Sequence, residues 1–160
     1  MSARSGRCFT ILRVAIVDDE PEVCSLLVSY VERYGKEQGT EFAVRTFKNG
    51  IALLNEDRLD FHIVFLDVEM PYMDGIETAR NLRKSNRTCA LIFVTNMTQY
   101  AIAGYEVDAM DYVVKPVSYE VFAFKMKRIL ERVALNESKN LTIKTREGFV
   151  YLDIQDIYYI

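Results

Sequence analysis

The chain has 160 residues, half of them hydrophobic, and a formal net charge of -3 at pH 7. This length suits one domain of ordinary size with a fragment beside it, and the apolar content is sufficient for a core without disulfides. The slightly acidic balance excludes a nucleic-acid binder that relies on a basic surface across the whole chain. No stretch is apolar enough to span a membrane, and residues 1–10 are predicted to be a disordered extension rather than a signal peptide. The three cysteines lack metal-ligand spacing, so we expect reduced thiols in a cytoplasmic protein.

The first half of the chain alternates apolar strands with helical patterns. Ile11–Val17 is a short apolar run typical of a buried strand. Pro21, a favoured first-turn residue, begins a predicted helix whose pattern runs as far as Gly35. Residues 42–47 alternate as a second strand, and a small helix is predicted after it. This order of elements is typical of the beginning of an α/β protein.

The same alternation continues in the second half. Phe61–Leu66 is a near-continuous apolar run, as expected of a strand buried on both faces. Asp74 is a suitable cap for the helix that follows it, and Ser118 for the last predicted helix. A short helix is predicted at Tyr100–Glu106, and it lies between the last two apolar runs, which are Leu91–Val94 and Tyr112–Val114. Five strand and helix units predict an α/β fold with a doubly wound five-stranded parallel sheet.

Four of the apolar runs end at polar side chains suited to phosphoryl chemistry. These side chains belong to Asp18 and Asp19, Asp67, Thr95, and Lys115. Since the carboxyl ends of parallel strands lie at one edge of a sheet and bind ligands there, we expect these residues to converge. Clustered carboxylates repel one another and attract a hard divalent cation, and Mg2+ is commonly held by one or two of them. The sequence therefore predicts a Mg2+ site at this edge.

An aspartyl phosphate is the product that such a site would support. Asp67 can attack a phosphorus centre as a carboxylate nucleophile. Lys115 can pair with one phosphoryl oxygen, and the Thr95 hydroxyl can donate to another. The metal and these two donors would offset the negative charge of the group in transfer.

The motifs around these residues resemble the receiver domain of two-component response regulators, over roughly Leu12 to Val133. The matching segments are the acid pair Asp18-Asp19, LDVEMPYMDG around Asp67, LIFVT ending at Thr95, and DYVVKP ending at Pro116. Together they are far more specific than one short pattern. The resemblance implies a flavodoxin-like (CheY-like) fold with the strand order 2-1-3-4-5.

The resemblance also implies roles for individual residues. It makes Asp67 the phosphoacceptor and Thr95 and Lys115 its catalytic partners, with a sensor histidine kinase as the donor of the phosphoryl group. Thr95 and Tyr112 resemble the switch pair of the family, and the Lys115–Pro116 peptide bond resembles one that the family keeps cis. The implied Mg2+ ligands are the carboxylates of Asp18, Asp19 and Asp67 and the backbone carbonyl of Glu69.

The last part of the chain follows a different pattern. Residues 136–140 are predicted to be a linker after a receiver domain at 11–135, and residues 141–160 alternate as a hairpin and the start of a third strand. This incomplete β-rich segment resembles the opening of a LytTR-type DNA-binding domain, with Asp156–Ile160 matching its DIxYI-like segment. The resemblance implies a transcription regulator that is longer than this chain and binds DNA through that domain. The alternative is an irregular β extension that packs on the receiver.

Aromatic side chains are expected on the surface formed by the fourth helix, the fifth strand and the fifth helix. Phe124 lies off the core stripe of the last helix, and Tyr100, Tyr105 and Tyr119 lie close to it in the predicted fold. Two interpretations stay open. Tyrosines tolerate half-exposed positions without a functional reason, and a homodimer or output face spanning Tyr100 to Phe124 would also expose them.

Two other functions stay open from the sequence. One is a receiver that signals only through protein contacts, without DNA. The other is a Mg2+-dependent phosphatase with an aspartyl nucleophile, but such enzymes typically carry the nucleophile on the first motif strand, whereas Asp67 follows a later one. We therefore prefer a phosphoacceptor switch, whose only enzymatic activities are self-phosphorylation and slow autodephosphorylation.

Overall fold

The computed structural model describes residues 11–97, 99, 101–145 and 148–153, and beyond residue 136 it describes the backbone alone. The extension predicted at residues 1–10, the aromatic residue Tyr100 and the LytTR-like segment Asp156–Ile160 lie outside the described residues. None of the helices in the described ranges is long and apolar enough to cross a membrane.

Five parallel strands form one sheet in the order β2-β1-β3-β4-β5. The strands are β1 (Leu12–Val17), β2 (Phe42–Phe47), β3 (Ile63–Leu66), β4 (Ala90–Thr95) and β5 (Asp111–Val114). The predicted flavodoxin-like order 2-1-3-4-5 is therefore confirmed, and so is the prediction of a parallel sheet from buried apolar runs.

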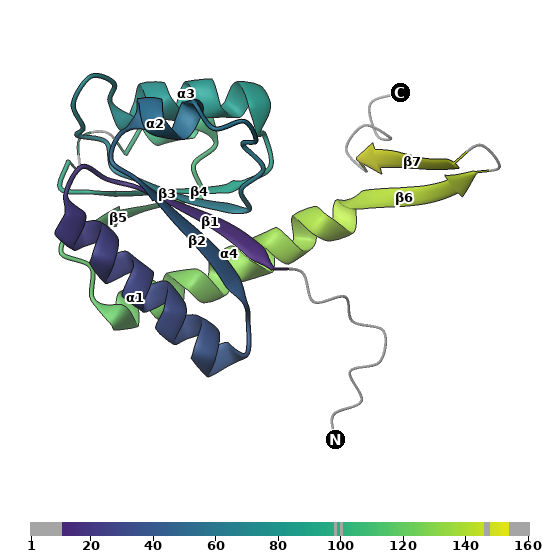
Figure 1. The fold of residues 1–160 in the computed structure, drawn as a ribbon, viewed down its shortest axis with the longest axis horizontal. Coiled ribbons are helices and arrows are strands. Elements are labelled where there is room, and N and C mark those ends of the chain that lie inside the picture. The colour runs from purple at the N-terminus through teal and green to yellow at the C-terminus, as the bar shows by residue number, and fades with distance from the viewer. Residues whose placement is uncertain (1–10, 98, 100, 146–147, 154–160) are drawn as a thin grey trace.

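Helices cover both faces of this sheet, as Figure 1 shows. The helices α1 and α4 lie on one face, and α2 and α3 lie on the other. Their bounds are α1 (Pro21–Gln38), α2 (Gly50–Leu54), α3 (Gly75–Ser85) and α4 (Tyr119–Lys139), with the 3-10 helix η2 (Ala103–Val107) between β4 and β5. This arrangement leaves the carboxyl ends of the strands as an open edge where polar side chains can gather.

Alternate residues of each central strand belong to two separate apolar cores. In β1, Val14 and Ile16 pack with α1 and α4, while Ala15 and Val17 pack with α2 and α3. All four are almost completely buried. Because both faces of a strand must be apolar in such a sheet, the chain shows continuous hydrophobic runs that end where the sheet ends.

The helix starts follow the predicted caps. The Asp74 carboxylate accepts a hydrogen bond from the Glu77 amide at the start of α3, and the Ser118 hydroxyl accepts one from the Val121 amide at the start of α4. These contacts satisfy amides that have no partner within the helix. Both predicted caps are confirmed.

Two helix ends differ from the expectation. Helix α1 continues through Gly35 to Gln38 and ends at Gly39, whose φ of 66° is left-handed. Gly35 is needed for a close approach, because a Cβ there would lie 2.7 Å from the Thr40 carbonyl oxygen. Helix α4 continues to Lys139, so most of the linker expected at 136–140 is helical. The segment contains neither Gly nor Pro to end the helix earlier.

The short helix expected at Tyr100–Glu106 is a 3-10 helix at Ala103–Val107 instead. Gly104 lowers the helix propensity in its middle, and Asp108 ends it in the left-handed conformation with a φ of 53°. After α4, the strands β6 (Asn140–Thr145) and β7 (Gly148–Asp153) pair antiparallel. The predicted hairpin is therefore confirmed.

Candidate functional site

The carboxyl ends of neighbouring strands place the expected residues at one edge of the sheet. The backbone amide of Asp67 donates to the carbonyl of Val17 at 3.0 Å, which aligns the ends of β3 and β1. The amide of Lys115 likewise donates to the carbonyl of Thr95 at 3.0 Å, which aligns β5 with β4. Because the strands are parallel and in register, residues that follow them in the sequence become neighbours in space.

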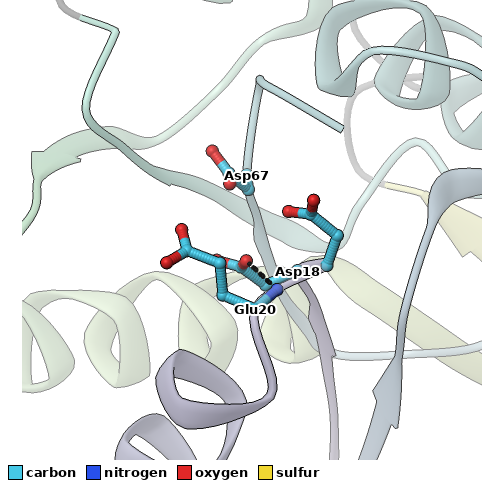
Figure 2. Close-up of side chains that lie close together, drawn as sticks. Asp18, Glu20 and Asp67 are labelled. Atoms are coloured by element: carbon cyan, nitrogen blue, oxygen red, sulfur yellow. Dashed lines mark hydrogen bonds between the residues drawn. The ribbon is translucent and has the colours of Figure 1, made fainter. Parts of the chain in front are cut away.

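Four carboxylates form a cluster at this edge, and Figure 2 shows three of them. One oxygen from each residue lies within 4.8 Å of the others, and the residues are Asp18, Asp19, Glu20 and Asp67. Asp18 and Asp67 are buried, whereas Asp19 and Glu20 are exposed. The amide of Glu20 donates to Oδ1 of Asp18 at 2.9 Å, which fixes the chain as it leaves β1.

The ammonium group of Lys115 lies inside this cluster. Its Nζ contacts three carboxylate oxygens, at 2.8 Å from Asp18, 3.0 Å from Glu20 and 3.1 Å from Asp67. The Lys115 side chain is only 8% exposed, and the peptide bond to Pro116 is cis. Lys115 therefore forms ion pairs with three of the four acids of the cluster.

Burial and charge act on the pKa values of this cluster in opposite directions. Burial disfavours the charged form of Lys115, but the hydrogen bonds that its ammonium donates to Asp18, Glu20 and Asp67 outweigh this effect and raise the pKa of the ammonium above its ordinary value. The pKa of Asp18 is also raised, mainly by burial and further by the nearby charge of Asp67, and Lys115 offsets only part of this. Four carboxylates surround one ammonium, so the acids of the cluster outnumber the lysine that neutralises them.

The loop after Asp67 is folded back tightly on the site. The amide of Gly75 donates to the carbonyl of Val68 at 2.8 Å, and the amide of Glu69 donates to Oδ1 of Asp67 at 3.3 Å. A Cβ on Gly75 would lie 2.1 Å from the Asp67 carbonyl oxygen, so only glycine fits there. Asp67 accordingly has one oxygen directed at a backbone amide and the other at Lys115.

The two residues predicted as a switch pair lie on adjacent strands. Thr95 is fully buried at the end of β4, and its hydroxyl accepts a hydrogen bond from the Met97 amide at 3.2 Å. Tyr112 is half-buried on β5, opposite Phe93, with the two ring centroids 6.0 Å apart. In the strand register Thr95 lies opposite Val114, two residues after Tyr112 on β5.

Glu20 extends the acid pair Asp18-Asp19 in the sequence, and the structure places it in the cluster as well. Its carboxylate contacts Lys115 and lies within reach of the other acids. The sequence signal for this placement is its position directly after the acid pair, where the chain turns into α1.

Comparison with protein families agrees with this geometry. A family model described as "Response regulator receiver domain" matches residues 14–127, which is most of the chain.

Curated relatives match over most of the chain as well. The sensory transduction protein LytT of Bacillus cereus is 29% identical over an alignment of 164 residues, covering 94% of this chain and 65% of LytT. The positive alginate biosynthesis regulatory protein of Pseudomonas aeruginosa is also 29% identical, over 92% of this chain and 64% of that protein. The chain thus spans slightly less than two thirds of the length of these relatives.

A solved structure of similar sequence is the response regulator TrrA of Thermotoga maritima in complex with Mg2+ and BeF. It has a TM-score of 0.64 and 28% identity, and the match covers 74% of this chain and 99% of TrrA. The fold, the acidic site and these matches agree, and the chain belongs to the response regulator receiver domain family.

Proposed function

We propose that Asp67 is the phosphoacceptor of this receiver and takes its phosphoryl group from a sensor histidine kinase in a Mg2+-dependent reaction. The observation that carries the proposal is the position of Asp67. Its carboxylate is 4% exposed at the carboxyl end of β3, with an ammonium group 3.1 Å from Oδ2 and three other acids close by. A receiver domain is a phosphoacceptor signalling module, and a module of this kind implies a partner histidine kinase.

The donor set of the cluster fits Mg2+. It consists of oxygen ligands alone, which this hard cation prefers, and its four carboxylates outnumber the one ammonium, of Lys115, that contacts three of them. The proposed ligands are the carboxylates of Asp18, Asp19 and Asp67 and the backbone carbonyl of Glu69. A bound Mg2+ supplies positive charge beside the group in transfer. TrrA, a relative in sequence and fold, was solved with Mg2+ and BeF.

Three residues of this chain have separate roles in the transfer of the phosphoryl group. A carboxylate oxygen of Asp67 forms the new bond to phosphorus as the bond between phosphorus and the kinase's histidine nitrogen breaks, and that nitrogen keeps the electron pair. The ammonium of Lys115 pairs with one phosphoryl oxygen, and the hydroxyl of Thr95 donates to another. To make this contact, the Lys115 ammonium breaks some of its contacts with the carboxylates of the cluster.

The switch follows from the same contacts. When Thr95 donates to the phosphoryl group, its side chain moves toward Asp67, and Tyr112 can move into the space beside it. The surface that would respond includes Tyr105, which is 85% exposed, and Phe124, which is 65% exposed. We extend the proposal to a homodimer through this surface, because large exposed apolar side chains gather there.

We propose an output through a second domain that follows the receiver. The β6-β7 hairpin after α4 agrees with the start of a LytTR-type DNA-binding domain, which the rest of a longer protein would complete. ResD of Bacillus subtilis, 29% identical over an alignment of 142 residues, is named a transcriptional regulatory protein. Regulation of transcription through DNA binding is therefore the proposed output.

Intact-mass spectrometry tests the phosphoacceptor. The chain is incubated with phosphoramidate, with and without Mg2+, beside the variants Asp67→Ala and Asp57→Ala, the latter being an exposed acid outside the cluster. We expect a Mg2+-dependent gain of one phosphoryl group in the unaltered chain and in Asp57→Ala, and none in Asp67→Ala. Equal phosphorylation of Asp67→Ala, or multiple-turnover release of phosphate from simple phosphate esters, would contradict the assignment.

A further inference from the structure

Tyr72 has an unusual backbone conformation in the loop between β3 and α3. Its φ is 72°, in the left-handed region that favours glycine. Among the described residues other than glycine, only Asp108 shares a positive φ, and Asp108 is a short polar residue at a helix end, where this conformation is tolerated. A bulky aromatic side chain in this conformation is strained.

The hydrogen bonding of the loop locates the backbone strain at Tyr72. The amide of Met73 donates to the carbonyl of Pro71 at 2.9 Å, which closes a three-residue γ-turn with Tyr72 at its centre. A γ-turn with a positive central φ is the rare and strained form of this turn. Glycine at position 72 would form the same turn at lower cost, so the fold does not require tyrosine there.

The side chain of Tyr72 does not compensate for this strain within the chain. It is 88% exposed, and the described residues give it no hydrogen bond, ion pair or ring contact. The loop is also held in place, because the amide of Gly75 donates a hydrogen bond to the carbonyl of Val68. The phenol ring is thus held outward on a fixed turn, at a cost in stability that no described contact offsets.

The location of the ring indicates what contacts it. The loop begins at Asp67 and lies at the same sheet edge as the acid cluster, so a protein that delivers a phosphoryl group to Asp67 must approach beside it. Half-buried Met70 and Met73 and exposed Pro71 flank Tyr72 in the sequence, so this loop is rich in apolar residues. The surface proposed for dimers involves different elements, η2, β5 and α4, which argues against a second copy of this chain as the occupant here.

We propose that Tyr72 is a docking residue for the phosphodonor protein and packs against apolar side chains beside its phosphorylated histidine. This inference rests on the proposed function of Asp67. Tyrosine is enriched among the residues that dominate interface energetics, since it offers a large contact area with few rotatable bonds. Holding it on a rigid turn lowers the entropy lost on binding, so the strain is compensated in the complex.

The test compares two phosphodonors on three variants. A purified histidine-phosphorylated sensor kinase, chosen beforehand as the one of a panel that transfers fastest to the unaltered chain, serves as the protein donor, and phosphoramidate serves as the small one. The variants are Tyr72→Gly, Tyr72→Phe and the control Ile51→Ala, which truncates an exposed apolar side chain of α2. Urea unfolding of each variant checks the fold.

We expect Tyr72→Gly to lower kcat/KM for transfer from the kinase by about tenfold, mostly through KM, and to change the rate with phosphoramidate by less than about twofold. Tyr72→Phe keeps most of the transfer rate, Ile51→Ala behaves as the unaltered chain, and Tyr72→Gly unfolds at the same or a higher urea concentration. Kinase transfer to Tyr72→Gly at the unaltered rate overturns the proposal. An equal loss with both donors also overturns it, because the residue would then act on the site itself. If neither donor phosphorylates the unaltered chain, the proposed function fails and the docking role fails with it.

Discussion

The ammonium nitrogen of Lys115 lies 2.8 Å from Oδ2 of Asp18, and both side chains are almost completely buried. The contact joins the end of β5 to the end of β1, two strands that are separated by β3 and β4 in the sheet. A lysine in this position balances part of the charge of the acid cluster. The lysine therefore neutralises the same carboxylates that a divalent cation would neutralise. Removing one cation should make the stability of the fold depend more strongly on the other.

Replacing Lys115 by methionine removes the cation and keeps the aliphatic length of the side chain. Two buried carboxylates then lose their charge partner, and we expect the free energy of unfolding without Mg2+ to fall by about 3 kcal/mol. Mg2+ should restore much of this loss, because it neutralises the same acids. Urea unfolding in EDTA and in excess Mg2+ measures both effects.

Lys127→Met is the matched control for this change, since Lys127 is an exposed lysine of the same chain. Its stability should change little and should not depend on Mg2+ more than that of the unaltered chain. A Lys115→Met variant as stable in EDTA as the unaltered chain would refute the role of Lys115 in charge balance.

Mg2+ itself should stabilise the folded chain through the acid cluster. Binding to the folded state alone adds about 2.7 kcal/mol at a free ligand concentration of 100 times Kd. We expect Asp18→Asn to lose most of this response, because it replaces a buried carboxylate of the cluster by a neutral amide. The thermal midpoint measured across a Mg2+ titration reports the effect. Asp57→Asn, which removes an exposed acid elsewhere, should retain the full response, and an unchanged response in Asp18→Asn would rule out the site.

Gly75→Ala should disrupt the loop that carries the acceptor. Alanine normally favours a helix over glycine, so the change would be stabilising at an unconstrained position of α3. Here the new Cβ would lie 2.1 Å from the carbonyl oxygen of Asp67, and the backbone must move. We expect a loss of about 2 kcal/mol or more in the free energy of unfolding, together with slower phosphorylation by phosphoramidate.

Gly104→Ala provides the comparison for Gly75→Ala. A Cβ at Gly104 would lie 3.4 Å from the Cβ of Ala109, which is an ordinary contact. This variant should unfold within about 0.5 kcal/mol of the unaltered chain and phosphorylate normally. Equal behaviour of the two variants would show that the close approach at Gly75 does not constrain the site.

Cys89 should be an unreactive thiol in the folded chain. Burial raises its pKa above the ordinary value of 9.0, and the Arg83 guanidinium, which donates to Sγ at 3.3 Å, offsets this only in part. Since the thiolate is the nucleophile, alkylation of Cys89 by iodoacetamide should be much slower in buffer than in urea. Peptide-resolved mass spectrometry measures the two rates, and equal rates would contradict the prediction.

The raised pKa of Cys89 also predicts how the free energy of unfolding changes with pH. Above the ordinary thiol value the unfolded chain releases this proton while the folded chain keeps it, so the free energy of unfolding falls as the pH rises. The stabilising contribution of the buried, protonated Cys89 thiol is fully present below the ordinary thiol pKa. It is lost as the pH rises through the higher pKa that the thiol has in the folded chain. Cys89→Ala lacks it, so its pH profile should be flatter in this range than that of the unaltered chain.

The fold class followed directly from local patterns in the chain. Short apolar runs such as Phe61–Leu66, bounded by polar residues, are typical of strands buried on both faces, and the helices between them favour parallel pairing. The same patterns placed Asp67 and Thr95 at one edge, since a strand's last residue lies where the sheet ends. Helix ends were less predictable: the helix that was expected to stop at Gly35 continues to Gln38 because Gly35 serves a close approach rather than a cap.

The sequence by itself therefore determined the fold class and the residue types at the site, because hydrophobic periodicity and strand ends are properties of short segments. Only the tertiary structure decided that Lys115 lies among three carboxylates and that Glu20 joins them, since these contacts depend on how side chains from distant segments are directed. It also decided that Tyr72 is strained and fully outward. A backbone conformation that opposes the local preference of its residue arises from the closure of the loop around it, and no short pattern in the sequence encodes that closure.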